Sequence, residues 1–136
     1  MIYRIENGLL KEGEGSGEIV GLFPLSEMEA AVSKYGLDSR VCAEPVRTRY
    51  SKFLGFPDLD CLILNVPTTW QKELSMQRLV ILLDRDKLFF FSENTALIRE
   101  AVSPRLKDGG KTSRELLLRD YLDHLVGRDS LFLDQL

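Results

Sequence analysis

The chain has little of the chemistry that most catalytic and metal sites require. Its 136 residues include one histidine and two cysteines. His124 lies among aliphatic residues in YLDHLVG, and neither an HxxxH nor an ExxH partner accompanies it, so we interpret it as a structural or surface residue rather than a metal ligand or base. Cys42 and Cys61 form no CxxC pair, and we expect two reduced, mostly buried thiols.

Nucleotide-binding and nucleophile motifs are also missing. No GxGxxG follows a predicted strand. The glycine-rich segment Lys11–Gly17 lacks the Gly-Lys-Ser/Thr ending of a phosphate loop, and its glutamates would repel phosphate, so we expect a hairpin tip there. Ser92, Ser113 and Ser130 lack the strand-turn-helix setting and the histidine that would activate a nucleophile. We therefore predict that the chain is not an enzyme.

Charge and hydrophobicity give no indication of nucleic acid or of a membrane span. The net charge of -3 provides no bulk attraction for phosphate, and we expect no nucleic-acid partner. The chain begins without a signal peptide, and its longest apolar runs are the length of a strand. One local basic segment is interpreted as a solvated or subunit-facing surface. It comprises Arg40, Arg47, Arg49 and Lys52, interleaved with Tyr50 and Phe53.

The most informative segment that is present is Gln77–Ser92. Leu79–Leu83 and Leu88–Phe91 are unbroken apolar runs, and the polar residues Asp84–Lys87 between them predict a tight turn. The two runs are therefore expected to be adjacent antiparallel strands. A strand with one face in water would alternate apolar and polar residues, so both faces of these strands should be covered. Helices are expected on both faces of the sheet.

The remaining pattern predicts an α/β fold: a mixed, mostly antiparallel sheet flanked by helices on both faces, an α/β/α sandwich. Residues 1–111 are expected to form the α/β domain, and Thr112–Leu136 a long helix that packs on it. This helix runs to the last residue without a cap, which predicts a fragment. The other predicted elements are an edge-type strand at Ile2–Ile5 with an Asn7-Gly8 turn into Leu9-Leu10, a strand at Glu18–Phe23, a helix from Pro24 with Ser26 as N-cap and Gly36 as stop, a helical turn at Ser39–Glu44, an irregular connection or exposed strand at Val46–Gly55, a strand at Leu59–Val66, its continuation at Trp70–Arg78 into the central hairpin, and a short helix at Glu93–Val102.

The order of these elements resembles the amino-terminal cytoplasmic domain of the CorA-type magnesium and divalent-cation transporters. The segments LSEMEAAVSKYGLD, SKFLGFPDLDCLILNV and QRLVILLDRDKLFFFSEN are similar to successive parts of that domain. LLLRDYLDHLVGRDSLFLDQL is similar to the start of the family's long stalk helix. The family's Gly-Met-Asn signature at the end of the first membrane helix is not in the chain, and Ser51-Lys52 stands where relatives have Arg-Pro.

The resemblance implies a function and a location. It implies the cytosolic, divalent-cation-sensing regulatory domain of a CorA-like transporter, at the cytoplasmic face of the inner membrane. Such a protein is a homopentamer, joined to the membrane through C-terminal helices that follow the truncated stalk. It also implies weak, regulatory binding of Mg²⁺ or another divalent cation between subunits. The implied ligands are Glu44, the one acid retained of a pair at Ala43-Glu44, and Asp123 at the start of the stalk.

Two alternatives remain open at this stage. The first is a stand-alone soluble α/β interaction or regulatory module without a transport role. The gene sequence beyond Leu136 discriminates, because two apolar spans with Gly-Met-Asn favour the transporter and a stop codon favours the module. The second is a small enzyme, which would require a pocket of converging polar groups and is disfavoured by the single histidine.

Overall fold

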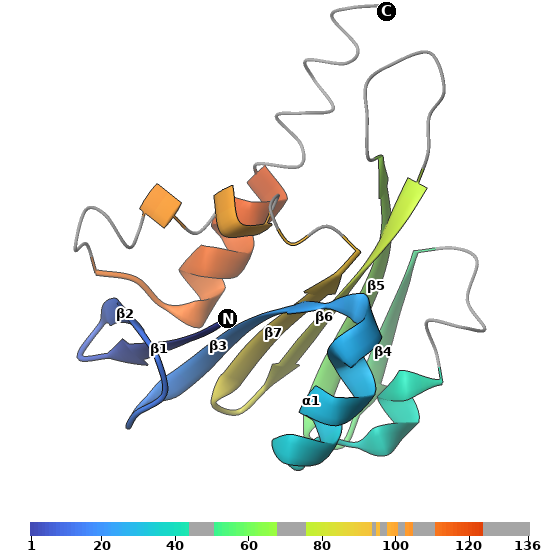
Figure 1. Cartoon of the computed structure of the whole chain (residues 1–136), viewed down its shortest axis with the longest axis horizontal. Coiled ribbons are helices and arrows are strands. Elements are labelled where there is room, and N and C mark those ends of the chain that lie inside the picture. Colours follow the sequence, from blue (N-terminus) through green and yellow to red (C-terminus); the bar gives the residue numbers. More distant parts are fainter. Residues whose placement is uncertain are drawn as a thin grey trace, which may run out of the picture.

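The described part of the chain is built around one seven-stranded sheet, with the strands in the order β2-β1-β3-β7-β6-β5-β4 (Figure 1). The computed structural model describes residues 1–43, 51–67, 76–93, 95, 98–100, 103–104 and 111–123. Its strands are β1 (Ile2–Glu6), β2 (Leu9–Glu12), β3 (Glu18–Pro24), β4 (Lys52–Phe56), β5 (Leu59–Pro67), β6 (Met76–Asp84) and β7 (Lys87–Ser92). β3 pairs with β7 in parallel, and the other neighbouring strands pair antiparallel. The predicted mixed, mostly antiparallel sheet is confirmed.

The N-terminal hairpin forms where the Asn-Gly pair predicts it. Asn7 and Gly8 have φ angles of 55° and 77°, the conformation that a two-residue turn between twisted strands requires. The prediction that the first strand lies at an edge is wrong. β1 pairs with β2 on one side and with β3 on the other, so β2 is the edge strand at this end of the described sheet. This position suits β1 because its Tyr3 and Ile5 are buried.

The central hairpin is confirmed, and both of its faces are covered. β6 and β7 pair antiparallel, with Leu83 opposite Leu88. Alternate residues enter two separate cores, as the pleat of a strand dictates. The first core receives Leu79, Ile81, Leu88 and Phe90, and the second receives Val80, Leu82, Phe89 and Phe91.

The second core is closed by α1 (Met28–Lys34), drawn in blue in Figure 1, together with the short 3-10 helices η1 (Leu25–Glu27) and η2 (Ser39–Cys42). Gly36 has a φ of 67° and follows the helix, as its predicted role as a stop requires. The prediction of Ser26 as N-cap is wrong. Ser26 lies inside η1, which follows directly on Pro24, and α1 begins only at Met28 with Glu27 as its N-cap residue.

The first core is closed by a helix at residues 114–123, drawn in orange in Figure 1, which we call helix 114–123. Leu117 and Tyr121 are fully buried in that core, and the Tyr121 ring lies 5.2 Å from the Phe90 ring. Ile98, from the region of the predicted Glu93–Val102 helix, joins them. Helices therefore cover both faces of the sheet, as predicted.

Helix 114–123 begins two residues later than predicted. The Thr112 N–H donates to the Gly8 carbonyl at 2.6 Å, and Lys111 forms a bridge with Leu9, so the chain is still extended there. The Ser113 hydroxyl then accepts from the Leu116 N–H at 3.1 Å and acts as the N-cap. The predicted continuation of this helix to Leu136 lies outside the described residues, and so does His124.

The predicted hairpin tip at Lys11–Gly17 is wrong, because Lys11 and Glu12 belong to β2 and the segment joins β2 to β3, which lie on opposite sides of β1. The segments that remain agree where the structure describes them. η2 lies within the predicted turn at Ser39–Glu44, and β4 shows that the end of the predicted Val46–Gly55 segment is an exposed strand. The Trp70–Arg78 extension is described only from Met76, where β6 begins. Cys61 is buried, Cys42 is half-buried, and neither forms a disulfide within the described residues.

Candidate functional site

The described residues do not assemble the two predicted metal ligands into a site. Glu44 lies outside them. Asp123 is exposed and is the last described residue of helix 114–123. Within the described residues, no group of three or more His, Cys, Asp or Glu side chains is placed to hold a metal ion. A weak divalent site built from Glu44 and Asp123 stays a prediction.

Carboxylates do gather at one end of the sheet, where the β4–β5 and β6–β7 turns lie side by side. Leu59 pairs with Asp84 at this end. Open cavities of about 290 Å³ and 200 Å³ there share the lining residues Phe56, Pro57, Asp58, Leu59 and Asp84. Asp38 lines the larger cavity, and Asp60 and Arg114 line the smaller one.

Asp38 is paired with the Arg40 side chain. Its carboxylate accepts hydrogen bonds from the Arg40 side chain and from the Arg40 backbone N–H. These bonds, the side-chain bond first, lower the pKa of Asp38 from its ordinary value of 3.8 to about 2. The Arg40 guanidinium also lies 5.2 Å from the centre of the Phe56 ring. This side of the larger cavity is therefore a structural ion pair.

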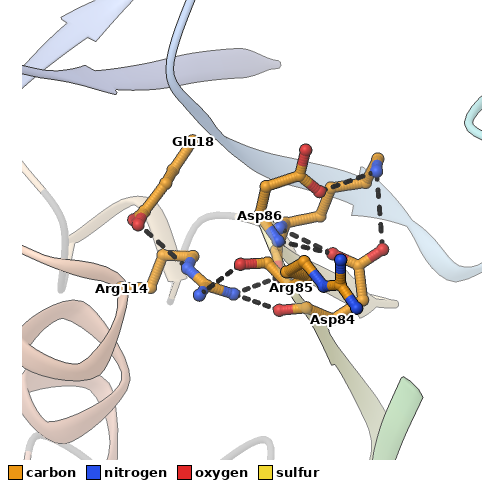
Figure 2. A network of polar contacts seen from close by, with 6 residues as sticks. Glu18, Asp84, Arg85, Asp86 and Arg114 are labelled. Carbon is orange, nitrogen blue, oxygen red and sulfur yellow. Dashed lines mark hydrogen bonds and ion pairs between the residues drawn. The ribbon is translucent and has the colours of Figure 1, made fainter. Parts of the chain in front are cut away.

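Asp84 organises the β6–β7 turn (Figure 2). Its Oδ1 accepts from the backbone N–H groups of Asp86 at 3.0 Å and Lys87 at 2.8 Å. The Lys87 ammonium lies 3.4 Å from Asp84 Oδ2 and 2.9 Å from Asp86 Oδ1. The hydrogen bond from Lys87 is the main reason that the pKa of Asp86 is lowered. Burial lowers the pKa of Lys87, but its contacts with Asp86 and Asp84 outweigh burial, and the net change is upward.

Arg114 joins this turn to the first turn of helix 114–123. Only 9% of Arg114 is exposed. Its Nη1 donates to the carbonyls of Asp84 and, at 3.2 Å, of Lys87, and its Nη2 donates to the Arg85 carbonyl at 2.7 Å. Figure 2 shows the guanidinium directed at these carbonyls, with Glu18 on its other side.

The contact between Arg114 and Glu18 is an ion pair without hydrogen-bond geometry. Arg114 Nε lies 3.2 Å from Glu18 Oε2. This buried nitrogen nevertheless has no hydrogen-bond acceptor within the described part of the chain, because the geometry of a hydrogen bond is not met. Glu18 is the more exposed partner, with 41% of its side chain accessible. The guanidinium charge is therefore balanced by one partly solvated carboxylate and by main-chain dipoles.

This arrangement can position structural elements, and it offers little chemistry. The terminal nitrogens of Arg114 are occupied by main-chain carbonyls, and Asp84 is occupied by main-chain N–H groups. Arg114, the start of β3 and the β6–β7 turn meet in one polar contact, which we call the clamp: Arg114, Glu18 and the carbonyls of Asp84, Arg85 and Lys87.

Our reading of the sequence did not identify Arg114, although two signals were present. A positive charge in the first turn of a helix opposes the helix dipole, so it calls for compensation from outside the helix. Arg114 also stands three and seven residues before the buried Leu117 and Tyr121, on the same face of the helix. An arginine on an apolar face, in an unfavourable turn, indicates a buried polar partner.

No family model and no curated protein sequence matches the chain. Its fold occurs in solved structures, among them the following two. The cytoplasmic domain of ZntB from Vibrio parahaemolyticus RIMD 2210633 matches 98% of this chain and 60% of its own, at a TM-score of 0.80 and 14% sequence identity. Full-length CmaX matches 98% of this chain and 47% of its own, at a TM-score of 0.75 and 11% identity. The chain thus spans less than two thirds of the length of either protein.

Within the described residues, no helix is both long enough and apolar enough to cross a membrane. At identities of 14% and 11%, the structural likeness establishes the fold. That fold is the one implied by the order of elements in the sequence, and the resemblance to the cytoplasmic domain of the CorA-type transporters is confirmed at the level of the fold.

Proposed function

We propose that the chain is the cytoplasmic regulatory domain of a CorA-like divalent-cation transporter. The observation that carries this proposal is the match of 98% of the chain to the ZntB cytoplasmic domain at a TM-score of 0.80. The match to full-length CmaX supports it, since that fold occurs there within a longer protein. On this proposal the domain acts at the cytoplasmic face of the membrane, in a homopentamer whose membrane helices lie in sequence beyond this chain.

The proposed mechanism is electrostatic. Carboxylates of neighbouring subunits repel one another until a divalent cation neutralises them, so the occupancy of the site biases an interface with two arrangements. Glu44 and Asp123 are the proposed contributors. Asp123 is exposed at its position on helix 114–123, as a ligand shared with a neighbouring subunit must be. Mg²⁺ prefers about six oxygen ligands in octahedral geometry, so two carboxylates without further partners give weak binding.

Calorimetric titration with MgCl₂ tests this proposal on two proteins, the present chain and a longer one that includes the downstream sequence. We expect weak or unmeasurable binding to the present chain and stronger binding to the longer one. Glu44→Ala and Asp123→Ala should each weaken binding to the longer protein. Glu115→Ala is the matched control, because Glu115 is another exposed carboxylate of helix 114–123. Tight binding to the present chain that neither substitution changes would mean that these carboxylates are not the ligands.

The absence of a catalytic function also stays a prediction. The clamp supports it, since the buried guanidinium and the carboxylate of Asp84 both serve main-chain groups. A stand-alone regulatory module of the same fold is the alternative outcome. It predicts a chain that functions without membrane helices, and the gene sequence after Leu136 distinguishes it from a transporter.

A further inference from the structure

Helix 114–123 is held to the sheet by contacts of two different kinds. Leu117 and Tyr121 are buried against the sheet, with the Tyr121 ring beside Phe90. Apolar burial of this kind is not directional, and it tolerates small rotations and shifts of the helix. The Arg114 contacts are directional, because a planar guanidinium must meet its acceptors along fixed N–H directions. The clamp is therefore a directional contact from the first turn of the helix, in addition to the hydrogen bond from the Thr112 N–H to the Gly8 carbonyl just before the helix.

We propose that Arg114 is a positioning residue that fixes the start of helix 114–123 to the β6–β7 turn, so that the direction of the helix depends on the geometry of that turn. The acceptors are three carbonyls of one short turn, those of Asp84, Arg85 and Lys87. The same turn is shaped from its other side by the Asp84 carboxylate, which binds the N–H groups of Asp86 and Lys87. The Asp84 side chain thus helps to orient the carbonyls to which Arg114 donates its hydrogen bonds (Figure 2).

Because Arg114 is buried, its position depends on whether its hydrogen-bond partners in the turn stay in place. A desolvated charge is tolerated only while its partners stay in place, and Glu18, its carboxylate partner among the described residues, is partly solvated. Arg114 Nε already lacks an acceptor within the described residues. A change in the turn that withdraws the Arg85 carbonyl would remove the acceptor of Nη2. A movement of the helix that restores this hydrogen bond would then be favoured. The clamp therefore converts a local change in the turn into a movement of the helix.

The consequence at the far end of the helix is sizeable. At a rise of about 1.5 Å per residue, a tilt of about 10° around Arg114 moves Asp123 by about 2 Å. The use of this movement to relay a signal toward a membrane rests on the proposed function. The positioning itself does not, because it involves only contacts within this chain.

Residual dipolar couplings of the backbone amides measure the angle between helix 114–123 and the sheet, and hydrogen exchange measures how often the helix detaches. We expect Arg114→Met to change or broaden this angle and to lower protection of the helix amides about tenfold, with the amides of β6 less affected. Arg114→Lys should behave similarly, because one ammonium cannot replace the guanidinium fork. Arg119→Met is the matched control, since Arg119 is an exposed arginine of the same helix.

A second control separates positioning from simple stability. Leu117→Val removes buried apolar volume from the same helix and leaves the clamp intact, so it should lower protection without changing the angle. An unchanged angle in both Arg114 variants, or an equal change in Leu117→Val, would overturn the proposal. Arg114→Lys provides the measurement should Arg114→Met fail to fold. The measurement of the couplings needs neither a cation nor a membrane, so it tests the role of Arg114 whether or not the transporter proposal holds.

Discussion

A methyl group added at Gly21 of β3 would enter the most crowded part of the second core. An ideal Cβ at this position lies 2.4 Å from Cε2 of Phe23 and 2.8 Å from Cδ1 of Phe89. Phe89 is fully buried and cannot retreat, whereas Phe23 is only partly buried. We therefore expect Gly21→Ala to push the Phe23 ring outward, away from Phe91, on which it stacks at 5.4 Å.

The size of the effect follows from overpacking. Forcing extra carbon atoms into a packed core costs about 1–3 kcal/mol, and disturbing an aromatic pair adds about 0.5–1.5 kcal/mol. Alanine also restricts the unfolded chain, which returns about 0.4–1 kcal/mol. We expect Gly21→Ala to lower the free energy of unfolding by about 2 kcal/mol. Urea unfolding followed by circular dichroism measures this change.

Two further variants make the reasoning refutable. Phe23→Leu removes the ring atoms that the new methyl group would meet, so the double variant should recover about 1 kcal/mol relative to the sum of the single changes. Gly55→Ala is the matched control, because the nearest atom to a Cβ there is Asp60 Oδ1 at 4.0 Å. A Gly21→Ala protein as stable as Gly55→Ala, or a cycle without coupling, would show that the ring contacts do not limit this site.

Three other predictions concern the first turn, the Asp38–Arg40 ion pair and the oligomeric state. Asn7→Ala should lower the free energy of unfolding by about 1 kcal/mol, because residue 7 has a φ of 55°, while Asn7→Gly should be close to neutral in the same urea assay. The pKa of Asp38 is lowered to about 2 by Arg40, so its stabilisation is complete above its ordinary value of 3.8 and is lost as the pH falls toward 2. The difference in urea midpoint between wild type and Asp38→Asn should accordingly vanish over that window, and a constant difference would contradict the ion pair. Sedimentation of the present chain should show a monomer or a weak oligomer, and a tight dimer would favour the stand-alone module.

The sequence predicts the central hairpin well because its signal is local and strong. Apolar runs on both sides of a polar turn leave few other structures, and Leu79–Leu83 and Leu88–Phe91 pair as expected. The assignment of the first strand to an edge failed for a non-local reason. Its status depends on where Glu18–Pro24 returns in the sheet, which a pattern within residues 2–5 cannot reveal. The Ser26 cap failed because a 3-10 turn came between Pro24 and the helix.

The polar contacts were harder to predict than the fold. Arg114 meets carbonyls that lie 27 to 30 residues away in the chain, and main-chain acceptors leave no trace in the side-chain sequence. Glu44 and Asp123 were implied by family resemblance, and a site shared between subunits takes ligands from other copies of the chain. A single sequence shows the candidates for such a site and not their neighbours.

The central proposal is that the chain belongs to a divalent-cation transporter, and ion flux tests it most directly. The product of the whole gene would be reconstituted into liposomes that contain a magnesium-sensitive dye, and Mg²⁺ entry would be followed with and without Mg²⁺ on the domain's side. We predict a flux that falls when the domain is exposed to Mg²⁺, and a weaker fall in Glu44→Ala and Asp123→Ala than in Glu115→Ala. A gene product that neither inserts into the membrane nor carries any divalent cation would contradict the account.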